Sequence, residues 1–295
     1  MSSPTVVIHG GAGSALDGTD REQTVRAELE RILDELWEVA RQNASAMELV
    51  ERGSVALEDC EEFNAGHGSK LQRDGGIRMS AAVMEGDRRA FSGVINAEWV
   101  KNPTKMAMYL QQEDSRVLDG RGAELLARQM GMELFDPIEK RRFSHWLDKT
   151  RRHRLGEKPQ ENADGTGTVG IVVRDAEGQL AAATSTGGRG FERVGRVSDT
   201  PTVAGNYATD KGAVSATGNG EDIIDEALAA RIVIRAEDGQ PLSQAVEETI
   251  AACDERDRRF GVIAVDEEGQ MSWATTTEVL LAVGRSEEAG TRWAF

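Results

Sequence analysis

Small hydroxyl side chains and glycines gather around one threonine in this 295-residue chain. Residues 165–170 read Gly-Thr-Gly-Thr-Val-Gly, and Thr168 stands at the head of an apolar stretch that predicts a strand. A threonine becomes a strong nucleophile when it is the first residue of a chain, because its own α-amine then acts as the base. Cleavage before Thr168 would therefore make this protein a hydrolase, whereas an uncut chain would lack part of the machinery.

Other catalytic patterns are missing from the sequence. It contains no Gly-x-Ser-x-Gly elbow and no phosphate-loop Gly-Lys-Ser/Thr, and its four histidines lack the spacing of paired metal ligands. The glycines of 10–13 follow His9 and resemble an esterase oxyanion loop only weakly. A tight turn, in which backbone passes close to backbone, is the simpler interpretation.

Two hairpins are predicted in the second half of the chain. The strands of each flank a four-residue turn that ends in glycine, and the pairs are 168–174 with 179–186 and 261–265 with 270–277. The second strand of each hairpin ends in a similar run, Ala-Thr-Ser-Thr (183–186) or Ala-Thr-Thr-Thr (274–277). We favour shared turn chemistry over internal pseudo-symmetry as the explanation.

The remaining elements occur in blocks. Strands are expected over 5–9, 77–84, 91–95 and 213–217, and helices over 20–51, 103–112, 122–130, 137–154, 221–237 and 242–253. Residues 54–70 are expected to be irregular, and 154–165 to form an exposed linker open to proteolysis. Since hairpins imply antiparallel pairing, helices packed on an antiparallel sheet are expected.

The composition excludes some classes of function. A net charge of −16 argues against nucleic-acid binding, and no apolar run is long enough to predict a membrane span. Two cysteines and an N-terminus without signal-peptide features make the cytoplasm the expected location. Only seven of the 35 basic residues are lysine, which favours a protein that works in high salt over an ordinary acidic protein.

Several motifs together resemble one family. Gly167–Gly170, Ala-Thr-Ser-Thr-Gly-Gly (183–188), Gly-Arg-Val-Ser-Asp (195–199) and Ala-Thr-Gly-Asn-Gly-Glu (216–221) are similar to motifs of the plant-type L-asparaginase/isoaspartyl peptidase family of N-terminal-nucleophile (Ntn) hydrolases. The resemblance is collinear over most of the chain, and extends to 9–13, 57–66 and 101–103. It implies an α+β fold, a single domain over 1–295 built as a four-layer αββα sandwich of antiparallel sheets flanked by helices. It also implies self-cleavage between Gly167 and Thr168 into an alpha subunit, 1–167, and a beta subunit, 168–295, with two processed protomers forming a homodimer.

The resemblance also assigns roles to individual residues. It implies Thr168 as the nucleophile, with a catalytic set of Thr186 and Asn64 to hold or support it and Thr217 and Gly218 as the oxyanion hole. Three residues would hold the amino-acid head group of the substrate: Arg196 its carboxylate, Asp199 its ammonium group, and Gly220 through its backbone. Gly218 would also contact the substrate.

A loop in the first half resembles the sodium-binding loop of the family. There the backbone carbonyls of six residues would hold a structural monovalent cation, namely Leu57, Glu58, Cys60, Phe63, Ala65 and His67. A plain structural loop is the alternative. The resemblance implies no organic cofactor.

The implied activity is hydrolysis of small molecules, L-asparagine and β-aspartyl (isoaspartyl) dipeptides, which share one head group and one scissile β-amide. A glycosylasparaginase is an alternative, although that group usually has Asp before the nucleophile, where this chain has Gly167. An uncleaved, inactive homologue acting as a binding protein is another. The chain departs from the family pattern at Ser80, where relatives commonly have Asp, and at Ser198, where they have Gly; Ser198 could tilt Arg196 and Asp199 if its position requires a positive φ.

Overall fold

An eight-stranded sheet forms one of the two central layers of the structure, a computed structural model that describes residues 3–16, 19–157 and 166–295. Its strand order is β12–β11–β1–β5–β6–β2–β3–β4, and every neighbouring pair is antiparallel except β3 and β4. The strands are β1 (Thr5–Gly13), β2 (Met79–Glu85), β3 (Ala90–Ala97), β4 (Val117–Leu118), β5 (Val169–Arg174), β6 (Leu180–Thr186), β11 (Val279–Ser286) and β12 (Gly290–Trp293).

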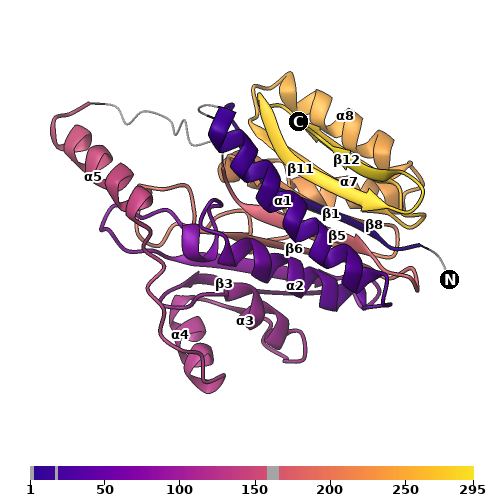
Figure 1. The fold of residues 1–295 in the computed structure, drawn as a ribbon, viewed down its shortest axis with the longest axis horizontal. Helices are drawn as coiled ribbons and strands as arrows, with labels where there is room; N and C mark the ends of the chain where they lie inside the picture. The colour runs from indigo at the N-terminus through magenta and orange to yellow at the C-terminus, as the bar shows by residue number, and fades with distance from the viewer. Residues whose placement is uncertain (1–2, 17–18, 158–165) are drawn as a thin grey trace.

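A four-stranded antiparallel sheet forms the second central layer, in the order β10–β9–β8–β7. Its strands are β7 (Asn206–Ala208), β8 (Gly212–Gly218), β9 (Phe260–Asp266) and β10 (Met271–Thr275). The helices are α1 (Thr19–Ala40), α2 (Ala46–Asp59), α3 (Pro103–Leu110), α4 (Gly120–Gln129), α5 (Lys140–Arg154), α6 (Gly220–Asp225), α7 (Leu228–Glu237) and α8 (Leu242–Asp254), with a 3₁₀ turn, η1, over Gly66–Gly68. Figure 1 shows α1 and α2 over the large sheet, with α7 and α8 beside the small one.

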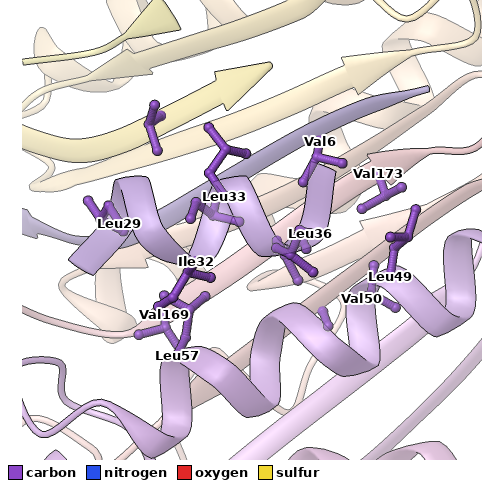
Figure 2. Close-up of a cluster of buried hydrophobic side chains, with 14 of the residues drawn as sticks. Val6, Leu29, Ile32, Leu33, Leu36, Leu49, Val50, Leu57, Val169 and Val173 are labelled. Carbon is purple, nitrogen blue, oxygen red and sulfur yellow. The ribbon is translucent and has the colours of Figure 1, made fainter. Parts of the chain in front are cut away.

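Alternation along β1 shows how the layers are built. Val6 and Ile8 point into a buried cluster with α1 and α2, while Val7 points into a cluster with the small sheet. Successive side chains of a strand point to opposite faces, so a strand apolar at every position is buried on both faces. Figure 2 shows the helical side of this core, where Leu33 and Leu49 lie over the sheet. The expected αββα sandwich is therefore confirmed.

Two predicted helices are broken in the structure. The helix expected over 20–51 is two helices, because Asn43 adopts a positive φ of 60° and Ser45 caps α2 by accepting a hydrogen bond from Glu48 N at 3.2 Å. The second helix continues to Asp59, so the prediction of irregular chain from residue 54 was wrong. Ala227, at a φ of 48°, likewise divides the helix expected over 221–237 into α6 and α7.

The two predicted hairpins form, but in different sheets. In both turns an aspartate side chain organises the backbone: Asp175 Oδ1 accepts from two backbone N–H groups of its turn, as does Asp266 Oδ1. Gly178 and Gly269 close the turns with φ of 90° and 86°. These matching turns support shared turn chemistry as the reason for the repeated pattern.

Strands β11 and β12, which were not predicted from the sequence, complete the large sheet beside β1. The linker expected over 154–165 falls mainly on 158–165, which lie outside the described residues. No helix within the described ranges is long and apolar enough to cross a membrane.

Candidate active site

Thr168 directly precedes β5, and its hydroxyl lies at the end of the large sheet. Its Oγ1 donates a hydrogen bond to Thr186 Oγ1 at 2.9 Å, and the side chain is buried. Thr186 is the last residue of β6, the neighbour of β5, so strand pairing brings the two hydroxyls together. Thr186 Oγ1 also accepts from Gly188 N at 3.1 Å, which fixes the position of the hydroxyl that orients Thr168.

Gly167, the residue before the nucleophile, is held by backbone hydrogen bonds at both its N–H and its carbonyl group. Gly167 N donates to Gly10 O at 3.0 Å, and Gly167 O accepts from Asn64 N at 3.1 Å. Gly11 has a φ of +129°, and a Cβ there would lie 2.2 Å from Gly167 N. The close backbone approach expected for residues 10–13 is therefore confirmed, although these residues belong to β1, beyond a bulge, and do not form a separate loop.

Asn64 joins the scissile peptide to the segment after Thr186. Besides its backbone contact with Gly167, its Nδ2 donates to Gly188 O at 2.6 Å and its Oδ1 accepts from Lys70 N at 2.9 Å. Both ends of the amide are thus used, so Asn64 has one defined orientation beside Thr168.

The proposed oxyanion residues come from the small sheet. Thr217 and Gly218 end β8, and Thr217 Oγ1 donates to Thr168 O at 3.4 Å. Gly218 has a φ of +138°, and a Cβ there would lie 2.5 Å from Phe260 Cα, so only glycine fits. A cavity of about 160 Å³ opens where the ends of the two sheets meet, lined by Ala12, Gly13, Ser14, Asn64, Lys70, Thr166, Gly167, Thr168, Gly188, Arg189 and Gly218.

The three head-group residues also lie together. A Cβ on Gly220 would lie 2.7 Å from Arg196 Nη2 and 2.7 Å from Asp199 Oδ1, so this backbone closes on both charged groups. Asp199 is buried, and burial raises the pKa of its carboxyl group to about 6. Its Oδ2 has no hydrogen-bond partner among the described residues.

Arg196 is already paired. Its guanidinium contacts Glu221 in a bidentate ion pair, with Nε–Oε1 at 2.8 Å and Nη2–Oε2 at 2.9 Å. Ser198 has no positive φ, so it replaces the family glycine without strain between Arg196 and Asp199.

In the loop after α2, two glycines lie close against backbone carbonyl oxygens. A Cβ on Gly66 would lie 2.2 Å from Glu58 O, and one on Gly68 would lie 2.0 Å from Phe63 O. The last carbonyls of a helix lack intrahelical donors and lie at the negative end of its dipole, a setting that suits a cation. Cys60 O and Ala65 O accept from Phe63 N and Gly68 N, but each carbonyl oxygen has a second lone pair.

No cluster of three His, Cys, Asp or Glu side chains in the described part of the chain could hold a metal ion. Of the side chains at the expected cation loop, the ring of His67 packs edge-on against Phe135 with centroids 5.6 Å apart. A cation at this loop would instead be held by backbone carbonyl oxygens, which is the form that the resemblance implies.

Sequence reasoning missed a buried carboxyl group beneath the site. Glu58 Oε1 accepts from Thr104 N (3.1 Å), Thr104 Oγ1 (2.7 Å) and Ser185 Oγ (2.7 Å), and burial raises the pKa of this group to about 7. It thereby anchors the residue before Thr186. An acidic residue on the apolar face of α2 was the only signal available.

His9 is a structural residue. Its Nε2 lies 2.9 Å from Ser215 Oγ, and burial lowers the pKa of the imidazole to about 3, so the ring is neutral near pH 7. Its neighbour Gly170 allows this fit, because a Cβ there would lie 2.3 Å from Nε2.

An αββα sandwich that sets a threonine hydroxyl at the head of a strand, beside a second threonine and a hydroxyl from the other sheet, is the architecture of the Ntn hydrolases. A family model described as asparaginase matches residues 2–293, and the chain belongs to this family.

Curated relatives are similar to this chain along nearly its whole length. An isoaspartyl peptidase/L-asparaginase from Synechocystis is 46% identical over 287 residues, which cover 95% of this chain and 87% of the relative. One of the same name from Nostoc is 44% identical over 95% of this chain and 91% of the relative. The human protein of that name is 34% identical over 93% and 91%.

Proposed function

We propose that this protein is an amidohydrolase that hydrolyses the side-chain amide of L-asparagine and the isopeptide bond of β-aspartyl dipeptides. The observation that carries the proposal is the hydrogen bond from Thr168 to Thr186 at the peptide bond after Gly167. The names of the relatives, isoaspartyl peptidase/L-asparaginase, support this pair of substrates. Gly167 before the nucleophile favours it over a glycosylasparaginase.

Activation begins with self-cleavage. Thr168 Oγ1 attacks the carbonyl carbon of Gly167, the Gly167–Thr168 C–N bond breaks, and the nitrogen takes up the hydroxyl proton, which leaves an ester. Water then hydrolyses the ester, so that Gly167 ends in a carboxylate and Thr168 regains its hydroxyl with a free α-amine. The products are the alpha subunit, 1–167, and the beta subunit, 168–295.

The free amine then serves the hydrolytic reaction. Its reference pKa is about 7.7–8.0, so a useful fraction is neutral near pH 7 and takes the hydroxyl proton as Oγ1 attacks the β-carbonyl of the substrate. Thr217 Oγ1 and Gly218 N–H stabilise the oxyanion. The ammonium passes its proton to the leaving amine, and water hydrolyses the aspartyl ester to regenerate Thr168.

Arg196 and Asp199 position the substrate for this attack. The guanidinium would bind the α-carboxylate after exchanging its present partner, Glu221, and Asp199 would bind the α-ammonium group. Gly220 leaves room for that head group. Because asparagine and β-aspartyl dipeptides carry the same head group, one clamp serves both substrates.

We also propose that the carbonyls of the loop 57–67 hold a sodium ion that stiffens the segment carrying Asn64. Exchange of sodium for a bulky organic cation should lower the thermal stability of the protein. Enzymes of this family need no organic cofactor. We further propose that two processed protomers form a homodimer, that the protein is cytoplasmic and that it works in high salt.

Activity assays with Thr168→Ala test the proposed function. The wild-type protein should release ammonia from L-asparagine and leucine from β-aspartyl-leucine, and the variant should do neither while keeping its fold by circular dichroism. Activity that survives the substitution would exclude Thr168 as the nucleophile.

A further inference from the structure

Three basic side chains from separate parts of the chain converge on Thr166, two residues before the nucleophile. Arg21 Nη2, from α1, and Arg142 Nη2, from α5, each lie 3.3 Å from Thr166 Oγ1. Lys70 Nζ, from the segment after η1, donates to Thr166 O at 3.2 Å. Thr166 is itself buried, so these contacts lie inside the protein.

Lys70 is held in this group at an electrostatic cost in the uncut chain, whereas Arg21 also lies 3.9 Å from the carboxylate of Glu62. Burial lowers the pKa of Lys70 well below its usual value, and the nearby charges of Arg142, Lys149 and Arg21 lower it further, while the charge of Glu192 opposes this shift. Lys70 forms no ion pair with a carboxylate of the described residues, and its hydrogen-bond partner is a neutral carbonyl oxygen. A buried positive group without an anion is costly, so the arrangement favours any negative charge that arrives beside it.

One of the two arginines of this group, Arg142, is held in place by the loop that follows α2. Arg142 Nε donates to Gly68 O at 2.8 Å, and its Nη2 donates to Glu62 O at 3.2 Å. Arg142 is buried as well, and burial lowers the pKa of its guanidinium to about 9. The cationic group is therefore a fixed part of the fold next to the scissile peptide.

Self-cleavage would create a negative charge at this place. Lys70 and Gly167 line the same cavity as Thr168, and hydrolysis of the ester leaves a carboxylate on Gly167. We propose that Lys70, supported by Arg21 and Arg142, forms a carboxylate-binding site that receives this new C-terminus. The inference rests on the proposed function, since it requires cleavage after Gly167.

Such a site has two consequences. A charge-assisted hydrogen bond between an ammonium and a carboxylate is about twice as strong as a neutral one, so the cleaved state is stabilised relative to the uncut chain. Binding at Lys70 also keeps the new Gly167 carboxylate from forming an ion pair with the α-amine of Thr168.

The test follows the wild-type protein, Lys70→Met, Lys70→Arg and Lys105→Met from the freshly made precursor. Lys105 is an exposed lysine of α3 and serves as the matched control. Intact mass gives the rate constant of self-cleavage, and we expect Lys70→Met to lower it roughly tenfold, Lys70→Arg to restore most of it, and Lys105→Met to leave it unchanged. The cleaved proteins are then treated with a carboxypeptidase, which should trim the alpha subunit from Gly167 in Lys70→Met but not in the wild type.

A third measurement distinguishes the two possible sources of the carboxylate. Hydrolysis of β-aspartyl-leucine is compared with that of β-aspartyl-leucinamide, which lacks the carboxylate of the leaving residue. If Lys70→Met selectively loses activity on the free acid while cleavage and trimming match the wild type, the substrate is the occupant and the assignment to Gly167 is overturned. Equal cleavage, trimming and substrate ratios in Lys70→Met and wild type would overturn the site itself, and a wild-type chain that never cleaves would remove the proposed function together with it.

Discussion

Replacement of Glu221 by Gln should tighten the binding of amino-acid head groups. In the structure the Arg196 guanidinium is engaged by both carboxylate oxygens of Glu221, at 2.8 and 2.9 Å, so the substrate carboxylate must displace Glu221. The Arg196 side chain is 14% exposed and that of Glu221 is 52% exposed, so solvent weakens this pair and about 1 kcal/mol is a fitting magnitude. An ion pair of that strength leaves Arg196 unpaired in about one molecule in six, so freeing Arg196 corresponds to about sixfold tighter binding.

The assay is titration calorimetry with L-aspartate, the product that carries the complete head group, on cleaved wild-type protein and Glu221→Gln. The dissociation constant of the variant should be about sixfold lower, with a parallel decrease in KM for asparagine. Removal of the Glu221 charge should also lower the pKa of Asp199, because that charge adds to the effect of burial on this carboxyl group. Weaker binding of L-aspartate by the variant would refute the reasoning and show that Glu221 is needed to hold Arg196 in place.

Three further predictions concern the groups around the nucleophile. Because burial raises the pKa of Asp199 to about 6, its negative charge is lost as the pH falls through that value, and L-aspartate should bind more weakly at lower pH; calorimetry that shows constant affinity between about pH 5 and pH 7.5 would contradict this. Thr186→Val removes the partner of Thr168 and should slow both self-cleavage and kcat by roughly tenfold, measured by intact mass and ammonia release, whereas an unchanged rate of cleavage would show that the 2.9 Å contact is dispensable. Gly11→Ala places a Cβ against Gly167 N and should block cleavage, while Gly13→Ala, which meets no atom within 4 Å, should cleave like the wild type; normal cleavage in both would mean that the close approach has no role.

The sequence predicted the parts of the site that depend on local spacing. Thr168 directly precedes the first strand of a hairpin and Thr186 ends the second. The turn of that hairpin is specified by Asp175 and Gly178, so the proximity of the two threonines follows from a short segment of chain. The motif residues Arg196 and Asp199 were likewise found, and the structure places them together at Gly220.

The missing parts depend on contacts between distant segments. Strand β11 pairs with β1 so that Ser286 lies opposite Thr5, a register that only the completed core determines. The capture of Arg196 by Glu221 spans 25 positions, and the hydrogen bond from Lys70 to Thr166 spans 96. Neither contact could be predicted from a local pattern, because the sequence does not show which distant residue a charged side chain contacts in the folded protein.

The central claim is that this chain cuts itself before Thr168, and the mass of the purified protein tests it most directly. The account predicts two polypeptides, residues 1–167 and 168–295, in the wild-type protein and one uncut chain in Thr168→Ala. A wild-type protein that stays uncut after long incubation, whether or not it hydrolyses asparagine, would contradict this claim.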